Sequence, residues 1–120
     1  MRNKKKTALR GLYGVIGAIL ILSVIHYIRL PEFHVMHSYS MSYTMKDGSR
    51  GRDTDLNVIV YKNRNDPELY KRIEYEHNHI NGEPTELKIR LFKSKNDIIK
   101  GREPYKVIVI DYQNNKVKIE

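Results

Sequence analysis

The 120-residue chain contains no cysteine and no tryptophan. The absence of cysteine excludes disulfide bonds, thiolate metal sites and a thiol nucleophile, and it excludes a lipoprotein anchor, which needs a thiol to carry the acyl chain. A folded domain in this chain must therefore be held together by its own apolar core. The aromatic residues are nine tyrosines and two phenylalanines, so most of the aromatic side chains carry a hydroxyl group.

Acidic residues are also absent before Glu32. This first part of the chain consists of a positively charged segment followed by a long apolar run. The positive charge belongs to Arg2, Lys4, Lys5, Lys6 and Arg10. Residues 11–28 then continue without any charged side chain. Eighteen helical residues rise roughly 27 Å, close to the thickness of a bilayer's hydrocarbon core. The sequence predicts a basic tail over residues 1–10 and a transmembrane signal-anchor helix over residues 11–29.

The charges on either side of this run predict its orientation. Short cytoplasmic flanks are enriched in lysine and arginine, whereas the distal flank here has one positive residue, Arg29, and one negative residue, Glu32. We therefore expect a single-pass protein of the cell membrane with its N-terminus inside and residues 31–120 outside. The alternative is a cleaved secretory signal, which normally ends in small residues; large residues end this run. Gly14 and Ala18 are spaced for a close helix–helix approach, which suggests a weak homodimer.

The net charge of +8 on its own suggests nucleic-acid binding, but the distribution of charge along the chain does not support this interpretation. Six of the 22 basic residues precede Pro31, so the remaining 16 face 14 acidic residues. The two signs are also interspersed there, whereas a nucleic-acid footprint is a concentrated basic stripe. We expect the lipid bilayer and a membrane or envelope protein as partners, and no nucleic acid.

Two periodicities predict the fold of residues 31–120. Residues 33–45 place apolar side chains at most odd positions and polar ones at even positions, which is typical of a long strand with one buried face. A second, antiparallel strand is expected over residues 56–61, after a loop over 46–55. A helix is expected after Pro67, with one inward face. That face consists of Leu69, Ile73, His77 and Ile80.

Three more short strands follow, over residues 86–92, 106–112 and 116–119, with a loop between the first two that has room for one helical turn. The resulting prediction is an α+β domain in the order β-β-α-β-β-β, with a small, mostly antiparallel sheet of about five strands packed on one helix. One helix cannot cover both faces of such a sheet. We therefore expect an exposed apolar patch that could bind a partner. Its residues are Ile59, Tyr61, Ile108, Ile110 and Tyr112.

Motifs for catalysis or cofactor binding are absent from the sequence, including a nucleophile elbow, a paired zinc-binding histidine motif and a phosphate-binding loop. Asp53 and Asp55 lack a nearby third calcium ligand. We predict no catalytic residue, no metal ligand and no cofactor. His37 and His77 both occupy inward positions, so they could meet between sheet and helix as a titrating pair.

These observations favour a non-catalytic interaction or accessory module of a membrane or envelope complex. The alternative is a module that senses a ligand, a metal or pH in the cleft between helix and sheet, using His37 and His77. A hydrolase is a third possibility, but no nucleophile can be identified for it.

Overall fold

The computed structural model describes residues 2–120, with side chains from residue 6 onward, and it divides into two compact units between Leu30 and Pro31. The first unit is helix α1, Arg2–Arg29. Its leucine, isoleucine and valine side chains are exposed around the whole helix, as expected for a segment that lipid would surround. Within it, Lys6–Arg29 is long and apolar enough to cross a membrane, which agrees with the predicted span.

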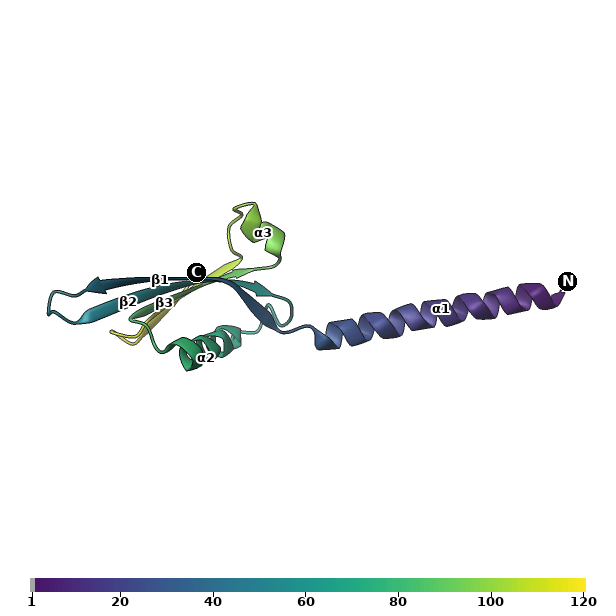
Figure 1. Cartoon of the computed structure of the whole chain (residues 1–120), viewed down its shortest axis with the longest axis horizontal. Helices are drawn as coiled ribbons and strands as arrows, with labels where there is room; N and C mark the ends of the chain where they lie inside the picture. Colours follow the sequence, from purple (N-terminus) through teal and green to yellow (C-terminus); the bar gives the residue numbers. More distant parts are fainter. Residues whose placement is uncertain (1) are drawn as a thin grey trace. The chain divides into compact units, whose positions relative to one another are not determined.

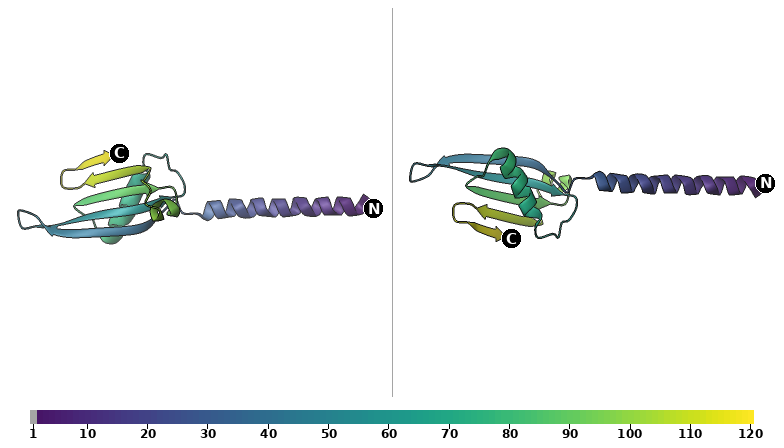
Figure 2. Two further views of the ribbon diagram at one scale, coloured as in Figure 1. Left: turned by 90° about the horizontal axis from the view of Figure 1, so that it is seen from above. Right: turned by 90° about the horizontal axis from the view of Figure 1, so that it is seen from below.

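The second unit is an α+β domain built on one five-stranded sheet in the order β1-β2-β3-β4-β5, seen from the side in Figure 1 and face-on in Figure 2. Its elements are β1 Phe33–Thr44, β2 Arg50–Val60, α2 Leu69–Asn81, β3 Glu86–Phe92, α3 Lys95–Ile99, β4 Lys106–Asp111 and β5 Lys116–Ile119. Three of the pairings are antiparallel, but β2 and β3 are parallel. The sheet is therefore mixed. Parallel neighbouring strands need a crossover connection between them, and α2 provides it for β2 and β3.

One buried cluster joins α2 to the sheet. On α2, Leu69 and Ile73 are at most 1% exposed, in agreement with the predicted helical period. The strand residues of this cluster are Leu56, Val58, Val60, Leu87, Ile89, Leu91, Ile108 and Ile110. Figures 1 and 2 show α2 along one face of the sheet and the short α3 on the opposite face. The prediction that Ile80 is also inward is wrong, because this residue of the last helical turn is 71% exposed.

A β-bulge divides β1 into two parts with opposite orientation. The register with β2 shifts between Val35 and His37, so one extra residue is inserted there. Beyond the bulge, Ser40 is the partner of buried Thr54, and their hydroxyl oxygens lie 3.0 Å apart. The serines therefore face α2, and the predicted burial of the odd positions is wrong for this half of the strand. The physical reason is that a single inserted residue exchanges the two faces of a strand.

The predicted loop over residues 46–55 is mostly strand. Only the turn between Thr44 and Arg50 leaves the ladder, and the Met45 amide donates to the Ser49 carbonyl oxygen at 2.7 Å to close it. Gly48 has a φ of 86°, which a residue without a side chain adopts without strain. Four charged residues of the predicted loop pair with β1 instead, so the hairpin is longer than expected; they are Arg50, Arg52, Asp53 and Asp55.

Candidate functional site

The expected apolar patch does not form, because its three isoleucines are buried. Ile108 and Ile110 face α2 and are 0% and 4% exposed, while Ile59 is 3% exposed and pairs with Phe92 on the side of α3. The prediction assumed that one sheet face was uncovered, but α3 and its flanking loops cover part of it (Figure 1). Tyr61 and Tyr112 remain partly exposed, at separate places in the fold.

The two candidate sensor histidines lie on opposite faces of the sheet. His37 follows the bulge and pairs with Asn57, so it faces away from α2. His77 faces the sheet from α2 and is 6% exposed. Without the bulge, period-two alternation would place His37 on the same side of the sheet as His77; the inserted residue puts it on the opposite side.

Asp53 and Asp55, the two aspartates discussed above as calcium ligands, both interact with other side chains of the domain. Asp55 forms an ion pair with Arg90 at 3.1 Å, and Asp53 accepts a hydrogen bond from the Tyr43 hydroxyl at 3.0 Å. Among the residues that the structure describes, no group of three or more histidine, aspartate or glutamate side chains is arranged to hold a metal ion.

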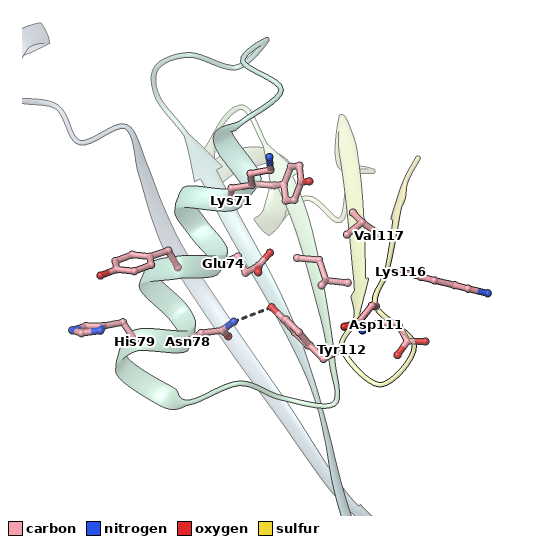
Figure 3. A pocket seen from close by; sticks show the side chains of 12 residues that line it. Lys71, Glu74, Asn78, His79, Asp111, Tyr112, Lys116 and Val117 are labelled. Atoms are coloured by element: carbon pink, nitrogen blue, oxygen red, sulfur yellow. Dashed lines mark hydrogen bonds between the residues drawn. The ribbon is translucent and has the colours of Figure 1, made fainter.

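A groove of about 740 Å³ lies between α2 and the end of the sheet formed by β4 and β5 (Figure 3). It forms because α2 packs on the middle strands, while β5 contributes no side chain to the buried cluster. Tyr70, Glu74 and Asn78 line it from α2. Ile110, Tyr112 and Val117 line it from the sheet. Apolar side chains and a few polar groups thus share one concave surface, which is the usual composition of a binding site.

The polar groups of this groove form a short hydrogen-bonded series. The Asn78 amide nitrogen donates to the Tyr112 hydroxyl at 2.9 Å, as Figure 3 shows, and the Asn78 oxygen lies 2.9 Å from Nδ1 of His77. Since that amide oxygen can only accept, His77 is the donor in this contact. Asn78 therefore links the buried helix face to the groove.

Glu74 and Tyr112, two of the ionisable groups that line the groove, have pKa values shifted toward the neutral form. The pKa of Tyr112 is raised to about 12, chiefly by burial; the nearby Glu74 carboxylate contributes to this rise, and the hydrogen bond from Asn78 opposes it. Burial also raises the pKa of Glu74 above its ordinary value. The Tyr112 phenol consequently keeps its proton at physiological pH and can take part in hydrogen bonds to a bound group.

The outer border of the groove is an open strand edge. Val107 and Glu120 exchange two backbone hydrogen bonds, so alternation along this antiparallel pair directs the backbone groups of Val117 and Ile119 away from β4. Their side chains are each 50% exposed on the α2 side of the sheet. The groove and this edge together could hold an extended peptide through both side-chain and main-chain contacts.

Sequence reasoning identified Tyr112 but missed its neighbours Glu74, Asn78 and Val117. Glu74 and Asn78 are four residues apart, so they share a helix face beside the inward one, and this spacing was the available signal. Their position opposite β5 depends on where α2 crosses the sheet, which no local pattern reveals. Comparisons with protein-family models, with curated proteins and with solved structures each found no match for this chain.

Proposed function

We propose that this chain is a single-pass membrane protein whose residues 31–120 form a non-catalytic interaction domain outside the cytoplasm. In this proposal the domain binds an extended segment of another membrane or envelope protein, and α1 keeps it at the bilayer. The observation on which the proposal chiefly depends is the groove between α2 and β5, with its apolar lining and adjoining strand edge.

The membrane location is supported by α1. Its apolar side chains are exposed on every side, and exposing so large an apolar surface to water is unfavourable. The orientation is supported by the five basic residues that precede the apolar run, against Arg29 and Glu32 after it.

Peptide binding is supported by the two kinds of contact that the groove offers. A strand added along β5 would bond to the backbone of Val117 and Ile119, while alternate side chains would enter the space between Val117 and α2. The four-residue length of β5 makes this edge short, so the side-chain contacts in the groove have to supply much of the specificity.

A matched pair of substitutions tests this site. Val117→Lys and Ile119→Lys change side chains that are equally exposed on the same strand and the same face, but only Val117 lines the groove. Full-length tagged protein is crosslinked in native membranes, extracted in mild detergent and examined for partners. We expect a specific partner with the unaltered chain and with Ile119→Lys, and its loss with Val117→Lys.

Equal capture by both variants would show that the partner uses another surface. Circular dichroism of each variant must show an intact fold, which we expect because both positions are half exposed.

A second candidate function is binding of a small ligand in the same groove. It is favoured by the convergence of Glu74, Asn78 and Tyr112, since a few directed polar groups in an apolar setting are typical of ligand sites. A ligand that raises the melting temperature of the full-length protein, but not of Tyr112→Phe, would support it. Ligands with equal effects on both proteins would count against this site.

A further inference from the structure

Strand β1 is an edge of the sheet, and its sequence lacks the features that normally protect such an edge. Only β2 borders it in the sheet order. Its twelve residues, Phe33–Thr44, contain no lysine, arginine, aspartate, glutamate or proline. Natural edge strands are usually short or carry charges and prolines, which prevent unwanted strand pairing. The opposite edge, β5, carries Lys116 and Lys118, which oppose pairing with a second copy of the same strand.

The backbone of β1 is oriented for further pairing. The Met45 amide bonds across the hairpin to Ser49, so alternation along the ladder directs odd-numbered residues toward β2. The backbone groups of Ser38, Ser40, Ser42 and Thr44 consequently point to the free edge. The regular part of the strand lies between the bulge at residue 36 and this turn, and its middle residue is Met41.

Large side chains on this stretch are exposed on the face opposite α2. Tyr39 is 58% exposed, Met41 72% and Tyr43 37%. Tyr43 is held in place, because its ring lies against Gly51 and its hydroxyl donates to Asp53. The side chains that point to the α2 face are small and uncharged serines. One face of the strand therefore presents large side chains, and the other face presents small hydroxyl-bearing ones.

We propose that β1 pairs antiparallel with β1 of a second copy of this chain, with a two-fold axis at Met41. This arrangement sets Tyr39 against Tyr43 of the second copy, Met41 against its equivalent, and Ser40 against Ser42 of the second copy. Aromatic pairs and hydroxyl pairs are favourable across strands, and no like charges meet. A two-fold axis requires such a self-complementary surface.

Pairing through β5 is less suitable for a dimer. A two-fold axis at Lys118 sets this lysine against its equivalent, and an axis at Val117 sets Lys116 against Lys118; like charges are unfavourable when directly opposed. The inferred β1 interface also lies at the other edge of the sheet from the proposed groove. It therefore goes beyond the proposed function, and either can fail without the other.

Single cysteines test the register, because the chain has no cysteine of its own. In full-length protein in native membranes, mild oxidation of Met41→Cys should give a covalent dimer, since opposed residues at a two-fold axis have Cα atoms about 4.5 to 5.5 Å apart. Tyr39→Cys should stay monomeric, because its equivalent lies four residues away along the partner strand, about 13 Å. Coexpressed Tyr39→Cys and Tyr43→Cys should form the mixed dimer.

Three results would overturn the proposal: no covalent dimer from Met41→Cys, equal dimer yields from every β1 position and from Val117→Cys on β5, or a disulfide from Met41→Cys to a different protein. An independent measurement is sedimentation of the cysteine-free protein in detergent. The unaltered chain should be dimeric and Met41→Lys monomeric with an unchanged circular dichroism spectrum. Monomeric behaviour of the unaltered chain would also contradict the inference.

Discussion

Glu74 is a residue of the groove whose acid–base chemistry is changed by burial. Its side chain is partly buried on α2, opposite Tyr112, and this burial raises its pKa. The folded domain therefore holds the Glu74 proton more tightly than the unfolded chain does. Ionisation of this carboxyl group as the pH rises consequently lowers the stability of the fold.

Glu74→Gln should remove this pH-dependent cost. Because the folded pKa is raised, the cost is absent below the ordinary glutamate pKa and develops as the pH rises through the raised value. We expect the variant to melt at a higher temperature than the unaltered protein at about pH 7 and at nearly the same temperature at about pH 3.5. The exposed Glu76→Gln provides the control, and a lower melting temperature of Glu74→Gln at pH 7 would contradict the prediction.

Ile73 and Ile80 lie on the same helix, but we expect them to contribute very differently to the free energy of unfolding. Ile73 is fully buried against the sheet, whereas Ile80 is 71% exposed. We expect Ile73→Ala to lower the free energy of unfolding by about 2 to 5 kcal/mol, through lost burial and a residual cavity. Ile80→Ala should change it by less than about 0.5 kcal/mol. Urea denaturation followed by circular dichroism measures both, and similar losses would show that α2 packs differently.

At the scale of elements, the bulge in β1 has the largest consequences. It turns Tyr39 and Met41 outward and brings Ser40 to the face of Thr54. It also places His37 on the opposite side of the sheet from α2. One inserted residue thus determines which side chains of this strand reach the core and which form its surface.

A designed disulfide tests the register beyond the bulge. Ser40 and Thr54 are direct partners with their hydroxyl oxygens 3.0 Å apart, so Ser40→Cys with Thr54→Cys should oxidise readily. Closing a loop of this length should stabilise the domain by about 3 kcal/mol. Non-reducing gels and thermal melts with and without reductant measure this.

Met41→Cys with Thr54→Cys is the control for that design, because these side chains lie on opposite faces. An intramolecular disulfide in the control, or none in the designed pair, would show that the strand has a different register. The absence of natural cysteine makes both results unambiguous.

At the scale of the whole molecule, charge is divided unequally between the two units. Residues 31–120 are almost neutral, with 16 basic and 14 acidic side chains, so most of the excess positive charge of the chain lies in its first 30 residues. This division favours a role for the basic segment in membrane orientation rather than in nucleic-acid binding.

Impermeant thiol labelling tests that orientation in intact cells. Gln113→Cys, in the exposed turn between β4 and β5, should be labelled from outside. Asn3→Cys, within the basic segment, should be labelled only after the membrane is permeabilised. The reverse pattern would contradict the expected topology, and loss of an N-terminal tag from the mature protein would indicate a cleaved signal instead.

The sequence by itself determined the features that depend on neighbouring residues. The apolar part of α1 follows from an uninterrupted apolar run, although the helix already begins at Arg2, within the basic segment. Strand β3 begins and ends at the residues that its alternation predicted. The inward positions Leu87, Ile89 and Leu91 are confirmed for the same reason. Such patterns are local, because the periods of helix and strand repeat within a few residues.

Only the tertiary structure decided which faces are covered and what they form. The bulge at residue 36, the parallel pairing of β2 with β3 and the groove beside Tyr112 all depend on residues far apart in the chain. Period-two alternation reveals that a strand has two faces, but not which face meets the core once a residue is inserted. The predicted isoleucine patch is buried because Ile108 and Ile110 face α2 and Ile59 lies on the side of α3, whereas the bulge leaves Tyr39 and Met41 exposed at an open edge.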